Sequence, residues 1–308
     1  MGTLFITHPA CLLHLVPLVI PETPARLRAV ERGLSGEDFR DLRRAQAPLA
    51  EPELALLAHT EAYVRGIEAK RPEKGFVYLD SDTVMSPGTW EAAMRALGAA
   101  RLAVDEVASG GARNAFVAAR PPGHHAEPER AMGFCLFNAA VIAARHAQRA
   151  HGLKRVAICD FDVHHGNGTQ VSVWSDPTIF YASTHQMPLF PGTGRRDETG
   201  AAGTILNVPM RAGDGGGAFR EAYERQILPA LDAFAPEMLI VSAGFDAHKD
   251  DPLANLELVE ADFAWMTKAL AGVAAAHCSG RLVSILEGGY NLEALSASAA
   301  AHVRELMA

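Results

Sequence analysis

The stretch RVAICDFDVHHGNGTQ, residues 155–170, places two aspartates and two histidines directly after a short apolar run. The apolar run, residues 156–159, is partly β-branched and predicts a buried strand that ends where the acidic residues begin. Because side chains alternate along a strand, we expect Asp160, Asp162 and His164 to point to the same side. Two neighbouring carboxylates repel each other unless a cation lies between them, and Asp with His suits Zn²⁺ or another divalent transition metal. The alternative interpretation is an ordinary polar turn after a strand.

The composition is that of a globular protein large enough to be an enzyme. Its 308 residues are 49% hydrophobic and 21% charged, which allows one large α/β domain or two small ones with a substantial core. The net charge of −8 argues against nucleic acid as a direct partner and mildly favours cationic substrates. Because no stretch has the composition of a linker and no repeat is visible, we expect residues 1–308 to form a single domain.

The cysteines and the N-terminal segment bear on the cellular location. The four cysteines are scattered and form no CxxC pair, so we expect reduced thiols and no disulfide. The apolar run at residues 11–20 lacks a basic leader and is too short to span a bilayer. We therefore expect a cytoplasmic protein without a membrane partner.

Short apolar runs alternate with Ala-rich amphipathic segments, which predicts an α/β fold with a parallel sheet and helices on both faces. The expected strands are residues 3–7, 114–118, 156–160, 178–183, 238–243 and 282–286. The expected helices are residues 89–109, 138–151, 217–234 and 260–277, which contain no internal proline except Pro229.

Four of the predicted strands are each followed by residues that can do chemistry: His124 and His125, the run described above, Asp246, and Tyr290. In open α/β sheets the ligand site forms at the carboxyl ends of the strands, so these side chains are predicted to meet. Each has an ordinary alternative, because a histidine pair can be solvated, Asp246 can cap a helix and Tyr290 can be a core aromatic. Their joint occurrence at equivalent positions favours one site.

A mechanism follows from these residue types. Asp162, His164 and Asp246 as ligands would leave one position of a zinc ion open for water, as a catalytic site requires. One histidine of the pair would then act as general base and acid, while the metal and a phenol polarise a carbonyl. Tyr290 follows two glycines and is the natural phenolic donor. These roles together indicate metal-assisted amide hydrolysis.

Six motifs, in this order along the chain, carry a resemblance to a known family: RPPGHH, GFCLFN, DFDVHHGNGT, PGTG, SAGFDAH and EGGYN. Together they resemble the histone deacetylase and acetylpolyamine amidohydrolase superfamily, nearest to the class II-type bacterial histone deacetylase-like amidohydrolases. The resemblance implies the arginase/deacetylase fold, a central parallel sheet of about eight strands with helices on both faces. It also implies a zinc-dependent deacylase.

The resemblance assigns roles residue by residue. The family's zinc ligands fall on Asp162, His164 and Asp246. Its tandem histidines fall on His124 and His125, the second being the proton shuttle, and its carbonyl-polarising tyrosine falls on Tyr290. Asp160 matches the carboxylate that orients the first histidine. Asn167 stands where some relatives have an aspartate behind the second, which should leave His125 less basic.

Two further sites are implied by the resemblance. A structural potassium ion beside the zinc would be bound mostly through backbone oxygens, at Asp160, Asp162, His164, Ser183 and Thr184. The acyl chain would enter a tunnel whose expected contacts are Gly133, Phe134, Phe190, Gly288 and Gly289. Without the resemblance, the two phenylalanines would be assigned to the core, whereas two facing rings in a tunnel admit a thin chain and exclude water.

One segment departs from the family pattern. Many relatives carry GHPERP after the first strand, whereas this chain reads HLVPLVIPETPARL, with Ile20 in place of the histidine and Thr23 in place of the arginine. We interpret the apolar residues 15–20 as a substrate patch, a homo-oligomer contact or a buried segment. The catalytic set is untouched by the change.

Three hypotheses for function remain. The favoured one is a zinc-dependent deacylase acting on an N-acyl amine, either acylated lysine in a peptide or protein or an acetylated polyamine. The alternatives are a zinc amidohydrolase of another small or xenobiotic amide, and a non-catalytic acyl-lysine binder. Acidic residues that a cationic substrate would need exist at Asp250, Asp251 and residues 127–129, but by default these are solvated charges. A binuclear manganese enzyme is disfavoured because Asp246 is the only carboxylate found on a second strand.

Overall fold

The apolar run of residues 156–159 lies in strand β6 (Val156–Asp160), inside an eight-stranded parallel sheet with the order β2-β1-β5-β10-β9-β6-β7-β8. The computed structural model describes residues 2–308. The other strands of the sheet are β1 (Thr3–Thr7), β2 (Arg43–Gln46), β5 (Asn114–Val117), β7 (Ile179–Gln186), β8 (Ile205–Met210), β9 (Met238–Ala243) and β10 (Leu282–Leu286). A separate short hairpin is formed by β3 (Val77–Tyr78) and β4 (Val84–Met85). The predicted parallel α/β sheet is confirmed.

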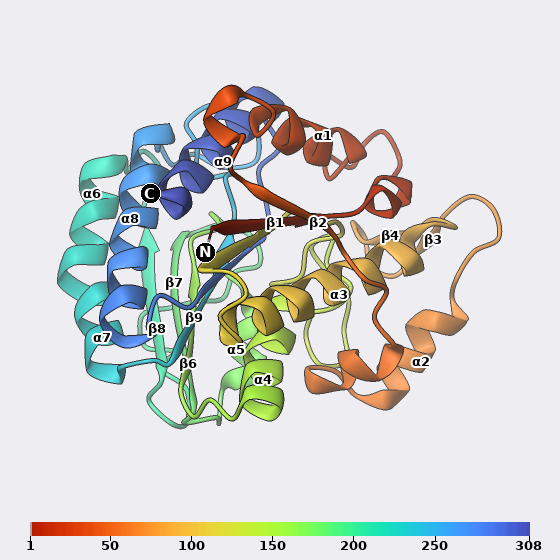
Figure 1. Ribbon diagram of the computed structural model, residues 1–308. Coiled ribbons are helices and arrows are strands. Elements are labelled where there is room, and N and C mark those ends of the chain that lie inside the picture. The colour runs from red at the N-terminus through yellow and green to blue at the C-terminus, as the bar shows by residue number, and fades with distance from the viewer. Residues whose placement is uncertain (1) are drawn as a thin grey trace.

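Helices cover both faces of this sheet (Figure 1). On one side α3 (Thr89–Ala108) and α4 (Ala139–His151) pack together, with α5 (Asn167–Val173) following β6. On the other side α1 (Pro24–Gly33), α8 (Glu260–His277) and α9 (Leu292–Met307) pack together, with α6 (Gly216–Ala222) and α7 (Leu228–Phe234) beside α8. Helix α2 (Glu61–Ala69) lies at the periphery, at the lower right of Figure 1, and a loop leads from it to the β3–β4 hairpin. Within residues 2–308, three short 3₁₀ turns lie at Pro9–Leu13, Glu37–Phe39 and Pro52–Leu57.

The central strands are mostly apolar because neither face of the sheet meets water. Every residue of β5, β6, β9 and β10 is buried. Strands covered on both faces need continuous apolar sequence rather than alternation, which is the pattern that the sequence shows. Small side chains on the buried faces of α3 and α4, such as Ala99, Ala103 and Ala143, let these helices lie close to the sheet.

Several elements differ from the prediction. Strand β7 continues to Gln186 instead of ending at residue 183. Strands β2 and β8 were not expected, because β2 is a polar, mostly exposed edge strand and β8 contains Pro209, which weakens the signal for a strand. Helices α1, α2, α5 and α9 were not expected either.

The predicted helix at residues 217–234 is one continuous helical segment with an irregularity. A π-helical turn at Tyr223–Ile227 separates α6 from α7. Pro229 lacks an N–H and so cannot donate the α-helical hydrogen bond to the carbonyl of Arg225. The wider turn before the proline accommodates this missing bond.

The register of the strands decides where the site forms. Asp160 at the end of β6 lies opposite Ser183 of β7 and Ser242 of β9, and Leu286 of β10 lies opposite Ala243. The carboxyl ends of these strands therefore share one edge of the sheet, and the loops that follow them meet there. Across residues 2–308, no helix has the length and apolar character needed to cross a bilayer.

Candidate active site

Three predicted metal ligands meet at the carboxyl edge of the sheet. Asp162 and His164 lie in the loop after β6, and Asp246 lies in the loop after β9. The Nδ1 atom of His164 is 3.2 Å from Oδ1 of Asp162 and 3.1 Å from Oδ2 of Asp246. All three residues are buried. They do not sit on a continuing strand, because β6 ends at Asp160, so the alternation expected to point Asp160, Asp162 and His164 to one side does not extend past Asp160.

The other oxygen of each carboxylate is held by the backbone. Asp162 Oδ2 accepts the N–H of Gly288 at 2.8 Å, and Asp246 Oδ1 accepts the N–H of Val163 at 2.9 Å. These bonds turn the remaining oxygens toward the imidazole of His164. Two carboxylate oxygens and one imidazole nitrogen, converging in a buried pocket, are a donor set that fits a divalent transition-metal ion such as Zn²⁺.

The packing around these ligands requires glycine at residue 288. A Cβ atom there would lie 2.1 Å from Oδ2 of Asp246 and 2.6 Å from Oδ2 of Asp162. Any side chain would therefore push both carboxylates out of place. Gly288 contributes through close backbone approach to the two carboxylates, and neither Gly288 nor Gly289, both predicted as substrate contacts, is among the residues that line the cavity described below.

The pKa values of Asp162, His164 and Asp246 are shifted because two carboxylates are buried next to one imidazole. Burial and the charge of Asp162 raise the pKa of Asp246 to about 7. Burial alone would lower the pKa of His164, but its hydrogen bonds to Asp162 and Asp246 outweigh burial and raise it to about 10. Burial would likewise raise the pKa of Asp162, yet the charge of His124 and the hydrogen bond from His164 lower it far below its ordinary value. Two carboxylates buried beside one imidazole thus favour positive charge between them.

The two tandem histidines differ in their partners. His124 Nδ1 lies 3.0 Å from Oδ2 of Asp160, and His125 Nδ1 lies 2.8 Å from Oδ1 of Asn167. Burial opposes protonation of His124, but the charges of Asp162 and Asp160 raise its pKa to about 10. Burial and the charges of His124 and His164 lower the pKa of His125 well below its ordinary value. His125 is therefore the neutral member of the pair.

The orientation of Asn167 fixes the tautomer of His125. The Nδ2 group of Asn167 donates to Oε1 of Glu127 at 2.8 Å, so its Oδ1 faces His125 and accepts from Nδ1. This leaves Nε2 of His125 without a proton and free to accept one. Glu127 was interpreted from the sequence as a solvated charge, but it is half-buried and helps to hold this arrangement.

A cavity of about 280 Å³ opens above the three ligands. It is lined by Asp82, His125, Gly133, Phe134, His164, Leu189, Phe190, Leu253 and Tyr290. The ring of Tyr290 meets that of Phe134 edge-on with centroids 5.9 Å apart, and the ring of Phe190 meets that of His125 at 5.1 Å. Phe190 is 42% exposed, so it is a cavity-lining side chain and not a core residue.

Gly133 and Phe134 form one wall of this cavity in an unusual backbone conformation. Both have positive φ angles, 56° and 66°, and a Cβ atom on Gly133 would lie 2.5 Å from Cδ2 of His125. The segment after β3 braces the wall. Asp82 Oδ1 accepts the N–H of Gly133 at 3.1 Å, and the Thr83 hydroxyl accepts the N–H of Phe134 at 3.0 Å.

The loop that carries Tyr290 is held by two residues that sequence reasoning missed. Asp251 Oδ2 accepts the N–H of Tyr290 at 2.6 Å. Arg26 donates from Nε to the carbonyl of Gly289 at 2.6 Å, and its guanidinium lies 4.8 Å from the centre of the Tyr290 ring. Asp251 is buried, so its interpretation as a solvated charge was wrong.

The segment that departs from the family pattern contains a buried ion-pair cluster. Glu22 accepts hydrogen bonds from Arg26 at 2.7 Å and from Arg120 at 2.6 Å, and all three side chains are buried. Arg26, rather than residue 23, therefore supplies a guanidinium beside the site. The sequence signal was an i,i+4 Glu–Arg pair at the start of α1. Before it, the apolar loop is divided, with Leu18 and Val19 exposed and Ile20 buried.

The expected potassium-site residues lie beneath the ligands. Asp160 and Ser183 are neighbours across β6 and β7. The Ser183 hydroxyl is 2.9 Å from Nδ1 of His185. The Thr184 hydroxyl is buried and, among the described residues, has no hydrogen-bond partner.

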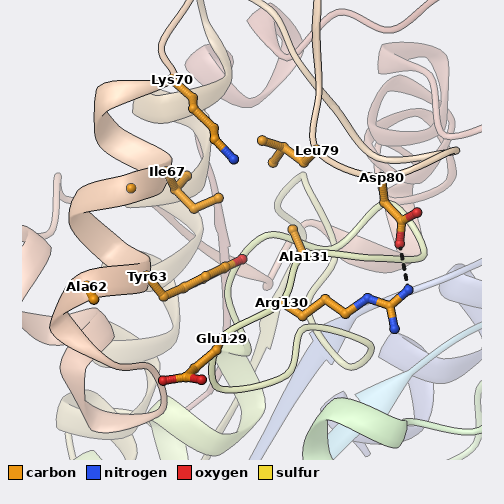
Figure 2. A pocket seen from close by; sticks show the side chains of 10 residues that line it. Ala62, Tyr63, Ile67, Lys70, Leu79, Asp80, Glu129, Arg130 and Ala131 are labelled. Carbon is orange, nitrogen blue, oxygen red and sulfur yellow. Dashed lines mark hydrogen bonds and ion pairs between the residues drawn. The ribbon is translucent and has the colours of Figure 1, made fainter.

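A larger cavity of about 410 Å³ lies elsewhere, between α2 and residues 129–131 (Figure 2). Its most polar contact is the ion pair of Arg130 with Asp80 at 3.1 Å, and Tyr63, Ile67 and Leu79 form its apolar wall. It contains none of the three ligands or the tandem histidines. The smaller cavity is therefore the candidate active site.

Comparison with known proteins agrees with this geometry. The histone deacetylase domain model matches residues 20–306. Histone deacetylase 14, chloroplastic, of Arabidopsis thaliana is 41% identical, with 98% of this chain and 73% of that protein covered. The histone deacetylase-like amidohydrolase of Pseudomonas aeruginosa is 40% identical, with 88% of this chain and 72% of that protein covered.

A solved structure shows the same architecture. The crystal structure of the HDA15 HD domain matches with a TM-score of 0.94 and 36% sequence identity, covering 99% of this chain and 88% of that chain. The fold is thus the predicted arginase/deacetylase fold. Since the family model and these relatives span nearly the whole chain, the chain belongs to the histone deacetylase family and is an amide hydrolase of the deacetylase type.

Proposed function

We propose that the protein is a zinc-dependent deacylase that hydrolyses the amide of an N-acyl amine, either acylated lysine in peptides and proteins or an acetylated polyamine. The observation that carries the proposal is the convergence of Asp162, His164 and Asp246 at the base of an apolar cavity that also contains His125 and Tyr290. Metal-assisted amide hydrolysis needs a metal with a free coordination position, a neutral base and a hydrogen-bond donor. The three ligands, His125 and Tyr290 can supply these.

The three ligands would hold the zinc ion through Oδ1 of Asp162, Nδ1 of His164 and Oδ2 of Asp246. When bound there, the ion supplies polarisation of the amide carbonyl and activation of water. The chain's own residues do the rest. His125 takes the proton of the attacking water on Nε2, because its Nδ1 donates to Asn167. The same nitrogen then returns a proton to the leaving amine.

His124 and Tyr290 have supporting roles in this proposal. His124, charged and hydrogen-bonded to Asp160, provides a fixed positive charge near the developing negative charge. Tyr290 donates its phenolic proton toward the carbonyl oxygen. Burial and the nearby carboxylates of Asp246 and Asp162 raise the pKa of Tyr290, whereas the guanidinium of Arg26 opposes this rise. The phenol therefore keeps its proton and can donate a hydrogen bond.

A potassium ion is proposed below the zinc site, held mostly by backbone oxygens of Asp160, Asp162 and His164, together with Ser183 and Thr184. The support is the burial of these residues together at the ends of β6 and β7, where Asp160 pairs with Ser183. Buried oxygens gain free energy from contact with a cation.

The shape of the cavity supports a slender substrate. Its wall consists of the rings of Phe134, Phe190 and Tyr290 with two leucines, and Asp82 is the one carboxylate in the lining of the described cavity. Apolar walls suit the methylene chain of lysine or of a polyamine. We also propose that residues 1–308 act as one domain, because five strand ends and α1 all contribute to the same site. A cytoplasmic location is proposed because the four cysteines are free, buried thiols, as in proteins of reducing compartments.

The experiment is a comparison of acetyl-lysine peptide and acetylputrescine as substrates of the purified protein. We expect turnover of at least one of them, loss of turnover with a chelator, and recovery on adding Zn²⁺. Turnover of aryl amides alone would move the assignment to another class of amide. Zinc-loaded protein that binds an acyl-lysine peptide without hydrolysing it would indicate a non-catalytic binder.

A further inference from the structure

A second group of metal-ligating side chains lies away from the candidate active site. Asp105 projects from α3, and His146 and His151 project from α4. Oδ1 of Asp105 is 2.7 Å from Nε2 of His146 and 2.8 Å from Nε2 of His151. The three ligand atoms all lie within 4.8 Å of one another. Two imidazole nitrogens thus converge on a single carboxylate oxygen.

This cluster occupies the opposite edge of the sheet from the tunnel. His151 is the last residue of α4, which leads into the amino end of β6, and Asp105 lies in the last turn of α3, which leads into β5. The proposed zinc ligands lie beyond the carboxyl end of β6. The two helices pack against each other along the same face of the sheet (Figure 1). The cluster is therefore a bridge between two helices and is not part of the proposed catalytic site.

Charge and exposure both suit an ion. Among the ion pairs of residues 2–308, Asp105 has only the two histidines as partners, and no Arg or Lys neutralises it. Burial raises the pKa of Asp105, but the hydrogen bonds from His146 and His151 outweigh burial and lower it, so the carboxylate is ionised. The side chains of His146, His151 and Asp105 are 14%, 23% and 43% exposed, so an ion can reach them from solvent.

We propose that Asp105, His146 and His151 form a second binding site for a first-row divalent transition-metal ion, such as Zn²⁺ or Ni²⁺. Imidazole and carboxylate ligands suit these ions, whereas Mg²⁺ and Ca²⁺ require mostly oxygen ligands. Each imidazole would bind the ion through Nε2 and carry its proton on Nδ1 instead, so that the two Nε2–H groups no longer point at one oxygen. Three protein ligands leave a position for water, and the ion would tie α3 to α4.

The chain contains another His–Asp ion pair that serves as a control, because it has too few ligands to form such a site. His277 on α8 lies 3.0 Å from Asp232 on α7, with one imidazole and one carboxylate. It is a surface ion pair of the same chemistry with one ligand fewer. Its removal controls for the loss of a surface histidine.

The test measures bound metal per chain, after equilibration with Zn²⁺ and again with Ni²⁺, in five full-length proteins. These are the wild type, His151→Ala, Asp105→Asn, His277→Ala and Asp162→Asn. We expect His151→Ala and Asp105→Asn to bind one ion fewer than the wild type, or to bind it at least about tenfold more weakly. His277→Ala should match the wild type, and Asp162→Asn should retain the ion at the second site.

A thermal melt and the deacylase assay complete the test. Added metal should raise the Tm of the wild type and of His277→Ala more than that of His151→Ala, because an ion that binds the folded state stabilises it. Deacylase activity should be the same in His151→Ala as in the wild type. An inactive wild type would contradict the proposed function without bearing on the second metal site. Equal metal content and equal affinity in the wild type, His151→Ala and Asp105→Asn would overturn the proposal. Asp105→Asn is nearly isosteric, which guards against misfolding as the cause of a loss.

Discussion

The carboxylate of Asp251 accepts the backbone N–H of Tyr290 at 2.6 Å and that of Asn291 at 3.1 Å. Asp251 follows Asp246 by five residues in the loop after β9. One buried side chain therefore connects the loop that carries a proposed zinc ligand to the loop that carries the phenol. The position of Tyr290 above the ligands depends on this connection.

Asp251→Asn is expected to lower kcat by roughly 10- to 100-fold with little change in KM, because the new amide cannot accept all the backbone donors and a small displacement of a catalytic group is costly. Metal content should stay normal. Asp250→Asn is the control, since Asp250 is the preceding residue and its side chain is 59% exposed. Equal kcat values in the two variants would show that Asp251 does not position Tyr290.

Tyr290→Phe is expected to lower kcat by about 10²- to 10³-fold, which is the usual effect of removing one hydrogen-bond donor to a developing oxyanion. The ring contact with Phe134 should persist, so KM should change little. Steady-state kinetics and metal analysis of the same preparation measure both. Full kcat at normal zinc content would remove Tyr290 from the mechanism.

Asn167→Asp tests the proposed base. The pKa of His125 is lowered by burial and by the charges of His124 and His164, so in the wild type His125 stays neutral well into the acidic range. A carboxylate 2.8 Å from Nδ1 would raise this pKa. Less neutral base would then be present at low pH, and the acidic limb of the kcat/KM profile should move to higher pH. An unchanged limb would place the base elsewhere.

Asp162→Asn should abolish stoichiometric zinc at the active site and nearly all activity. The variant replaces one of three ligands by a weaker, uncharged one. Asp232→Asn is the control, because Asp232 is exposed and pairs with His277 far from the loops at the carboxyl edge. Zinc at the active site of Asp162→Asn, seen by its anomalous scattering, would contradict the ligand assignment.

Gly133→Ala should reduce activity while leaving zinc bound. The added Cβ would meet the ring of His125 at 2.5 Å, and the φ angle of 56° disfavours any residue but glycine. Gly75→Ala is a control for the backbone effect alone, since Gly75 has a φ angle of 66° with open space around its Cβ position. Similar kcat values in the two variants would show that the wall does not constrain His125.

The sequence predicted the centre of the fold well because the central strands carry strong signals. β6, β9 and β10 are mostly apolar runs, and their boundaries match the predicted ones. The edge strand β2 reads RRAQ and becomes a strand only by pairing with β1. Such pairing is a tertiary effect that local sequence does not encode.

The candidate site was predicted to the extent that its residues lie in recognisable motifs. Asp162, His164 and Asp246 do converge, and His124 and His125 contact Asp160 and Asn167 as expected. The supporting residues were missed, because a buried charge looks like a surface charge in sequence. Glu22 is an example: burial would raise its pKa, but Arg120, His14 and Arg26 lower it far below the ordinary value. Only the folded chain shows that these partners surround it.

The backbone bonds from Val163 and Gly288 to the outer oxygens of Asp246 and Asp162 also have a bearing on metal exchange. They hold both carboxylates in place through the backbone, so the orientation of these two ligands does not rely on an ion alone. Ions should then leave and return without any refolding of the chain, so inactivation by chelators is expected to be reversible.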